Sequence, residues 1–385
     1  MTREEFDILC RQEVREAIDA AIERNPLEIA LDRRVPYARE VATQVKYLQK
    51  AKSKLPSLYA VRAIVPPRAF EQSSSEECAS AKHIEGDSLL DLTCGLGVDV
   101  AAFARKFKRV VTLERDEVLA DVVRENFLRQ GVTNVEVITS SAEDFVSTTD
   151  EHFDWVYADP DRRTDDGKRV FRLEDCSPNM LSLMPSLRRI ANKIAMKLSP
   201  LFDVDEAFRL FDNCSVEVVS LGGECKEVMV YIDSRPAQIV AEAVGRGRFV
   251  ISREEAMKEQ VVPTEFAAAE YRYLIIPDVS LQKARLTRCA LSRCADVWSD
   301  NAFGFARTLP EDVLGRVEPI QSIEAFDIKR FKREMKGVGV DLLVRDYPVS
   351  VEELRKRCSL RSGSECRVAI TRILGRDYLI RLAKM

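Results

Sequence analysis

Histidine is scarce in this sequence, and its scarcity limits the chemistry that the chain can carry. Only His83 and His152 occur among 385 residues, and none of the ten cysteines forms a C-x-x-C pair. Zinc sites draw their ligands from clusters of cysteine and histidine, so we predict no metal site and expect no histidine-based catalytic triad. We interpret most of the cysteines as small core residues, because a cytosolic chain keeps its thiols reduced.

Long apolar runs are missing as well. No window reaches the roughly 18 uninterrupted apolar residues of a membrane span, and residues 1–10 lack the apolar segment of a signal peptide. A hydrophobic fraction of 46% can still fill several cores, which excludes a disordered chain. The length predicts two or three domains. The sequence therefore indicates a soluble, cytoplasmic, multi-domain protein with no membrane partner, and it leaves the oligomeric state open.

The near-neutral charge balance conceals an asymmetry along the chain. The total of 59 Lys and Arg against 63 Asp and Glu gives a net charge of −4. Residues 315–385 carry 16 basic and 10 acidic side chains, or +6, whereas the rest carries 43 and 53, or −10. A basic C-terminal region on an acidic body points to a polyanionic partner.

The hydrophobic pattern changes from helical to alternating near residue 88. Residues 6–22 and 37–54 repeat apolar side chains at helical spacing, which predicts an N-terminal helical layer. Strands and helices then alternate, which is typical of an α/β fold with a doubly wound, Rossmann-like parallel sheet. We predict strands at 88–94, 109–115, 135–139, 153–159, 193–199, 215–221 and 227–232. The last two are too close for a parallel crossover, so they should form an antiparallel hairpin.

The strongest motif is a glycine-containing turn after the first predicted strand. Gly95 and Gly97 let the backbone pass close to a ligand and expose amides at a helix start. Val100 stands where the nicotinamide fingerprint needs a third glycine. Asp91 and Asp99 at the two ends of the turn would repel a pyrophosphate but suit a cationic amino-acid ligand.

Polar side chains also follow the next strands. Glu114 closes the second one, where an acid can hold ribose hydroxyls. Residues 140–145 follow the third and can contact an adenine ring, although the acids there also fit a helix N-terminus. Residues 159–163, Asp-Pro-Asp-Arg-Arg, follow the fourth. Asp159 can accept hydrogen bonds from an amine, and the two arginines suit phosphate. The alternative interpretation is an acidic turn with a solvated arginine pair.

These motifs resemble those of class I S-adenosylmethionine-dependent methyltransferases. The whole chain more narrowly resembles bacterial methyltransferases with a C-terminal THUMP-like domain, through the further segments 70–75, 197–200 and 222–227. The resemblance implies a seven-stranded core sheet that ends in the antiparallel hairpin. It also implies four domains: an N-terminal helical domain (1–69), a class I methyltransferase domain (70–236), an α+β ferredoxin-like linker domain (237–314) and a basic α+β THUMP-like domain (315–385).

The resemblance also implies a cofactor, S-adenosylmethionine, and a role for each motif. Asp91 and the turn after it would lie beside the methionine ammonium and carboxylate. Glu114 would bind the ribose, Ala142 or its neighbours would cover the adenine, and the methyl group would point toward Asp159. The predicted cofactor-binding residues are Asp91, Thr93, Gly95, Gly97, Asp99, Glu114, Ala142 and Asp159.

The atom that accepts the methyl group is less clear from the motifs. We expect Asp159, Pro160 and Arg162 to act in transfer. Amino methyltransferases present an acid, two prolines and an aromatic residue, but Asp161 and Arg162 occupy the last two positions here. Transfer to pyrimidine carbon-5 needs a cysteine nucleophile, and Ser199 occupies its expected place. Amine transfer is therefore in doubt and carbon-5 transfer is disfavoured.

The basic C-terminal region supplies the argument for the substrate. THUMP modules bring structured RNA to a fused modifying domain, so the resemblance implies a tRNA or rRNA methyltransferase. The predicted substrate-binding residues are Arg162, Arg163, Lys329, Arg330 and Arg333. Two alternatives stay open: a methyltransferase of a small molecule or protein, and a non-catalytic RNA-binding protein that retains the methyltransferase fold.

Overall fold

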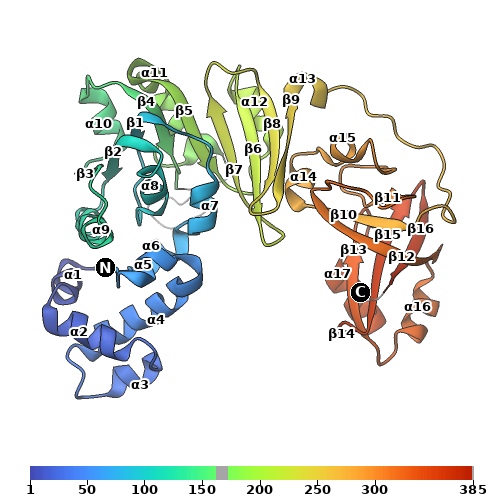
Figure 1. Ribbon diagram of the computed structural model, residues 1–385, viewed down its shortest axis with the longest axis horizontal. Helices are drawn as coiled ribbons and strands as arrows, with labels where there is room; N and C mark the ends of the chain where they lie inside the picture. Colours follow the sequence, from blue (N-terminus) through green and yellow to red (C-terminus); the bar gives the residue numbers. More distant parts are fainter. Residues whose placement is uncertain (162–171, 384–385) are drawn as a thin grey trace. The chain divides into compact units, whose positions relative to one another are not determined.

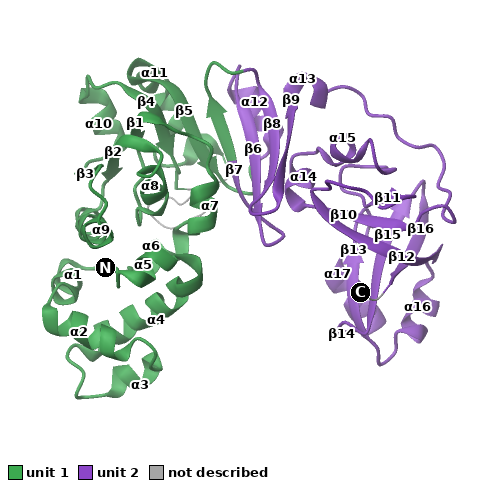
Figure 2. Ribbon diagram, in the orientation of Figure 1, with its two compact units in different colours: residues 1–202, 229–235 green, residues 203–228, 236–385 purple. Residues whose placement is uncertain are grey.

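The computed structural model describes residues 1–161 and 172–383. Its helices and strands are labelled along the chain in Figure 1. The chain divides into two compact units, coloured separately in Figure 2. The first unit comprises residues 1–202 and 229–235, and the second comprises residues 203–228 and 236–385. Strand β7 (Glu224–Ile232) contributes residues to both.

Short helices form the N-terminal layer of the first unit. They begin at good caps: Thr2 and Glu5 form a capping box at α1, and Asn25 caps α3 with Pro26 in its first turn. The predicted run 6–22 is two helices, because Arg11 between them is extended. The layer consists of α1 (Arg3–Leu9), α2 (Gln12–Ala21), α3 (Pro26–Leu31), α4 (Ala38–Lys54), α5 (Pro56–Ala60), α6 (Pro67–Gln72) and α7 (Glu76–Ala81).

This layer shares a hydrophobic core with two helices that flank the parallel sheet, α8 (Val98–Phe103) and α9 (Glu117–Gln130). Buried Asn126 of α9 fixes the contact, because its side chain accepts a hydrogen bond from the Ile64 amide (2.8 Å) and donates one to the Ile64 carbonyl (2.9 Å). The helical layer and the sheet are therefore packed as one unit, and the layer covers α8 and α9.

The parallel sheet confirms the predicted Rossmann-like arrangement. Within the first unit the strand order is β3-β2-β1-β4-β5-β7, and the pairs among β1 to β5 are parallel. Apolar residues fill the middle strands, leucine in β1 and both valine and leucine in β2, as burial on both faces requires. The elements are β1 (Gly86–Asp91), β2 (Phe107–Glu114), β3 (Val135–Thr139), α10 (Ala142–Thr148), β4 (Phe153–Ala158), a 3₁₀ turn (Leu173–Asp175), α11 (Met180–Ile190) and β5 (Ala191–Leu198).

The hairpin of β6 (Ser215–Leu221) and β7 has the predicted position. Gly222 and Gly223 form its two-residue turn with φ of +64° and +84°, the left-handed values that favour glycine. Helix α12 (Val204–Leu210) precedes it. Two strands that the sequence pattern did not predict extend this side: β8 (Gln238–Ala243) runs parallel to β6, and β9 (Gly247–Ser252) runs antiparallel to β8.

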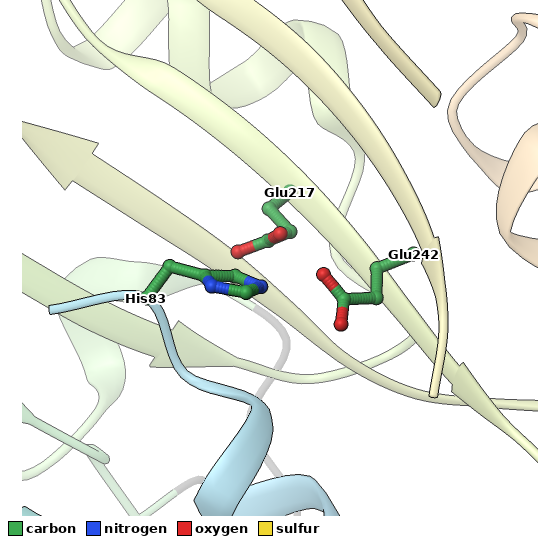
Figure 3. Close-up of side chains that lie close together, drawn as sticks. All are labelled: His83, Glu217 and Glu242. Carbon is green, nitrogen blue, oxygen red and sulfur yellow. The ribbon is translucent and has the colours of Figure 1, made fainter. Parts of the chain in front are cut away.

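Two acidic side chains lie side by side on these strands, Glu217 of β6 and Glu242 of β8 (Figure 3). Glu217 is only 3% exposed, and Arg248 of β9 contacts both carboxylates, at 3.1 Å and 3.4 Å. Because a buried carboxylate needs a compensating charge, Arg248 helps to fix β9 against the other two strands.

The second sheet of the second unit has the order β11-β10-β12-β16-β15-β13-β14. Helices α16 (Ile328–Glu334) and α17 (Val351–Cys358) pack on it through Phe331 and Leu354. The other elements are α13 (Arg253–Ala256), β10 (Tyr273–Pro277), α14 (Val279–Lys283), α15 (Thr287–Leu291), β11 (Gly304–Ala306), β12 (Gly315–Ala325), β13 (Gly339–Val344), β14 (Arg361–Ser362), β15 (Cys366–Ile373) and β16 (Arg376–Leu382).

Residues 237–314 contribute strands to both sheets of the second unit, β8 and β9 to one and β10 and β11 to the other. The predicted helix at 280–295 is divided into α14 and α15, since Arg285 between them has a left-handed φ of +57°. Among the described residues, no helix has the length and apolar content needed to cross a membrane.

Candidate functional site

The predicted site residues of the first unit meet at one edge of the parallel sheet. Asp91 and Glu114 are the last residues of β1 and β2, and Asp159 directly follows β4. Because neighbouring parallel strands end on the same side of a sheet, their terminal side chains converge there. Backbone hydrogen bonds tie the strand ends together, among them Cys94 N–H to the Leu113 carbonyl at 2.9 Å.

Asp91 supports the turn from inside. Its carboxylate accepts hydrogen bonds from the Thr112 hydroxyl (2.6 Å) and the Thr93 amide (3.1 Å), and the residue is only 1% exposed. Burial raises the pKa of Asp91 to about 7, against the opposing effect of the Thr112 and Thr93 hydrogen bonds. These contacts make Asp91 a residue that shapes the turn, and its direct contact with a ligand stays a prediction.

The two glycines of the turn serve different needs. Gly97 precedes α8 with φ +78°, and a Cβ there would lie 2.9 Å from Phe127 and 3.1 Å from Val123. Gly95 has φ +55°, but a Cβ there would meet no atom within 4 Å. Gly97 is therefore required for packing, whereas the backbone at Gly95 borders open space that a ligand can enter.

Glu114 is fixed beside the turn. One carboxylate oxygen accepts a hydrogen bond from the Gly95 amide (3.0 Å), and the other accepts one from the Asp116 amide (2.9 Å). Burial raises the pKa of Glu114 above its usual value, and those two hydrogen bonds oppose the shift. An acid at the end of β2 next to an open glycine backbone suits a ligand that carries a ribose beside an amino-acid group. These residues fit S-adenosylmethionine.

Asp99 lies in the first turn of α8 and is surrounded by donors. It contacts Lys82 Nζ at 2.8 Å and accepts a hydrogen bond from the Tyr157 hydroxyl at 2.9 Å, and Lys197 Nζ lies at 4.0 Å. Lys82 is 1% exposed. Burial disfavours the charged form of Asp99, but the two ammonium groups outweigh it and lower the pKa to about 2. Asp99 is thus a buried anion compensated by lysine.

Asp159 is placed by both its backbone and its side chain. Its amide donates to the Thr93 hydroxyl at 2.7 Å, and its Oδ2 pairs with Lys197 Nζ. Asp161 then exchanges two backbone hydrogen bonds with Ser177 (2.8 and 3.0 Å). Pro160, between them, is buried. The predicted Arg162 and Arg163 lie outside the described residues.

The third strand leads into α10, which Ser141 caps by accepting a hydrogen bond from the Asp144 amide at 3.0 Å. The acids in this turn therefore match the helix N-terminus that the sequence offered as an alternative. Ala142 is buried in the first turn of α10. Its contact with an adenine ring stays a prediction.

Sequence reasoning missed four polar residues of this edge: Lys82, Thr112, Tyr157 and Lys197. Lys197 lies within a segment that carried the family resemblance, but no role was inferred for it. A lysine near the end of a largely buried strand was the available signal, since burying a lysine requires a partner. Lys82, on the segment before β1, offered no comparable signal.

In the second unit, α16 displays exposed positive charge. Lys329, Lys332, Arg333 and Lys336 are spaced i, i+3, i+4 and i+7, so they follow one helical face into the residues after the helix. Among the described residues, these four form no salt bridge. Arg330, by contrast, pairs with Glu334 (2.7 Å) and Glu324 (3.1 Å). We call the four residues the basic stripe.

Comparisons with known proteins agree with this architecture. Residues 89–171 match a methyltransferase domain, and residues 315–384 match a THUMP domain-like family. An uncharacterized S-adenosylmethionine-dependent methyltransferase of Mycobacterium tuberculosis (strain H37Rv) is 24% identical over 317 residues, which cover 79% of this chain and 83% of the relative. The crystal structure of a presumed methyltransferase from Porphyromonas gingivalis W83 is 25% identical with a TM-score of 0.84, and covers 100% of this chain and 99% of that one.

A shorter match is to a ribosomal RNA methyltransferase. Ribosomal RNA small subunit methyltransferase J of Francisella tularensis subsp. novicida is 30% identical over 99 residues, which are 22% of this chain and 41% of the relative. Taken together, the matches confirm the predicted methyltransferase fold with its C-terminal THUMP-like domain. They support a SAM-dependent methyltransferase as the enzyme class and S-adenosylmethionine as the cofactor.

Proposed function

We propose that this protein transfers a methyl group from S-adenosylmethionine to structured RNA, either tRNA or rRNA, in the cytoplasm. The observation that carries the RNA part is the basic stripe on α16, within the THUMP-like domain. Unpaired, exposed Lys and Arg attract phosphates and release their counterions, which gives affinity without reading the base sequence. The partial likeness to a ribosomal RNA methyltransferase supports the same substrate class.

The cofactor would be held at the carboxyl edge of the parallel sheet. In this proposal the Gly95 backbone approaches the amino-acid end, Glu114 binds the ribose, and the residues around Ala142 face the adenine. Asp91, Thr93, Gly97 and Asp99 keep the turn and the start of α8 in place. Residues 159–161 face the acceptor, and residues 315–385 hold the RNA while residues 70–236 carry out the transfer.

The test is a salt titration of RNA binding with matched charge variants. Replacing Lys329, Lys332 and Arg333 by alanine removes three charges of the basic stripe. We expect the slope of log Kd against log salt to decrease in magnitude by about 2 to 3, since each lost phosphate contact contributes roughly 0.7 to 0.9. The control replaces Arg246, Lys258 and Arg293, three exposed basic residues of the same unit outside α16 and α17.

The control variant should bind RNA with the slope of the wild-type protein. Equal slopes for all three proteins would contradict the proposed RNA surface. They would favour a small molecule or protein as substrate. Calorimetry with S-adenosylmethionine tests the cofactor part separately, because no basic-stripe residue belongs to the cofactor edge, and both variants should bind it as the wild type does.

A further inference from the structure

The pair formed by Asp159 and Lys197 lies beside the expected position of the transferred methyl group. Lys197 Nζ contacts Asp159 Oδ2 and lies 4.0 Å from Asp99 Oδ2. The Lys197 side chain is 13% exposed and that of Asp159 is 36% exposed, so the carboxylate is the part of the pair that a substrate can reach. Lys82 and Lys197 together balance the charges of Asp99 and Asp159.

One oxygen of the Asp159 carboxylate pairs with Lys197, and the other is available to accept a hydrogen bond from a substrate. Oδ2 faces the lysine, whereas Oδ1 accepts no hydrogen bond from the residues that the structure describes. An exocyclic amine brings two N–H groups and a flat base that needs a stacking surface. A hydroxyl group needs no stacking surface, and Oδ1 can accept its single proton.

The described residues directly around Asp159 also offer no surface for stacking a base. Pro160 is buried, and Asp161 is held by its backbone bridge to Ser177. Tyr157 precedes Asp159, but it is buried and its hydroxyl donates to Asp99. Within the described part of this segment, residues 157–161, no aromatic face is therefore presented to a base.

The positive charge of Lys197 also favours an oxygen atom over a nitrogen atom as the methyl acceptor. An amine that attacks a sulfonium becomes positively charged until it loses a proton, and the nearby Lys197 ammonium opposes that charge. A hydroxyl that gives up its proton during attack develops negative charge on oxygen, which the same ammonium stabilises. A hydroxyl is also too weak a nucleophile to react without a base in hydrogen-bond reach.

We propose that the methyl acceptor is a ribose 2′-hydroxyl of RNA, with Asp159 as the base and Lys197 as the residue that positions it. This inference rests on the proposed function. S-adenosylmethionine supplies a methyl group on a sulfonium, whose carbon–sulfur bond breaks with the electron pair left on sulfur. The acceptor oxygen forms the new bond to carbon, and its proton passes to the Asp159 carboxylate. RNA offers this hydroxyl at every nucleotide and DNA does not.

The position of the methyl group in the product tests the acceptor directly. The full-length protein is incubated with S-adenosylmethionine labelled in the methyl group and with total RNA from a strain that lacks its gene. The RNA is then digested to nucleosides for mass spectrometry. The label should lie in the sugar fragment, and alkali should leave labelled dinucleotides intact, because a 2′-O-methyl group blocks cleavage.

The outcomes separate this inference from the function on which it rests. Label in a base fragment, in RNA that alkali cleaves fully, would overturn the 2′-hydroxyl and leave an RNA methyltransferase. Absence of label from every RNA would contradict the proposed function itself.

Substitutions at Lys197 test the positioning role. Lys197→Met should lower kcat about 100-fold, the range of a misplaced general base, with S-adenosylmethionine affinity unchanged within about twofold. Lys197→Arg keeps the positive charge, so its kcat should be about tenfold higher than that of Lys197→Met.

A matched control is available on the same strand. Lys193 lies four residues before Lys197, on the same side of β5, and its ammonium lies 5.4 Å from the centre of the Trp155 ring. Lys193→Met should keep the wild-type kcat. Wild-type kcat in Lys197→Met would overturn the role of Lys197. A second result would also overturn it: loss of both activity and cofactor binding in Lys197→Met, with neither restored in Lys197→Arg. That result would indicate that Lys197 is purely structural.

Discussion

The two units use lysine in opposite ways. In the first, Lys82 and Lys197 are largely withdrawn from water and each contacts an aspartate. In the second, Lys329 and Lys332 are exposed and have no carboxylate partner among the described residues. A buried charge is tolerated only with a partner, whereas an exposed one is available to phosphate. In the proposed function, the first pair organises the transfer site and the second belongs to the RNA-binding surface.

Lys82→Met should have the largest effect on stability. It removes the nearer ammonium partner of the buried Asp99 and leaves the more distant Lys197. Removal of one partner from a buried ion pair costs about 3–5 kcal/mol of unfolding free energy. Urea denaturation at pH 7 measures the loss. Lys332→Met is the control: it should unfold at the wild-type urea concentration and bind RNA more weakly. Equal urea midpoints for the two variants would remove the distinction between the two kinds of lysine.

The pH dependence of stability should distinguish the two buried acids. The pKa of Asp91 is raised to about 7, so between pH 4 and 7 the unfolded chain loses a proton that the folded protein retains. Rising pH therefore favours unfolding, by roughly 2–4 kcal/mol in total for this group. The pKa of Asp99 is lowered to about 2, so its stabilisation is complete above about pH 4 and disappears only in stronger acid.

Asp91→Asn isolates this contribution, because asparagine does not ionise. The difference in urea midpoint between variant and wild type should change steadily in favour of the variant from pH 4 to pH 7, and then level off. A difference that stays constant over this range would show that Asp91 titrates near its ordinary pKa.

The smallest predicted difference concerns the two glycines of the turn. Gly97→Ala combines a left-handed φ with a clash against Phe127, so it should lower the unfolding free energy by about 2–3 kcal/mol. Gly95→Ala has only the unfavourable φ, which costs about 1–2 kcal/mol, but its methyl group enters the space assigned to cofactor. In thermal unfolding, Gly97→Ala should therefore be the less stable variant. In calorimetry, Gly95→Ala should lose more affinity for S-adenosylmethionine.

Local patterns in the sequence were sufficient for the methyltransferase core. The strand at 135–139 has its predicted bounds, and the turn after Asp91 lies between strand and helix as expected. Both follow from signals within a few residues: an apolar run, a glycine, a helix cap. The β6–β7 hairpin was predictable because a short connection leaves no other topology.

Features that depend on distant contacts could not be predicted in the same way. Strands β8 and β9 are short, and β8 pairs with β6, 23 residues earlier. The contact of Lys82, just after α7, with Asp99 of α8 joins residues 17 apart, and that of Lys197 with Asp159 joins residues 38 apart. Side-chain pairing across elements depends on packing and register, which residue type and spacing alone do not determine.

Steady-state methylation of RNA by three proteins tests the central claim most directly: wild type, Asp159→Asn and the triple basic-stripe variant. We predict that Asp159→Asn lowers kcat and leaves the KM for RNA unchanged. The basic-stripe variant should raise that KM about tenfold or more at physiological salt and keep kcat. Loss of kcat in the basic-stripe variant with an unchanged KM, or no methyl transfer to RNA by the wild-type protein, would contradict the account.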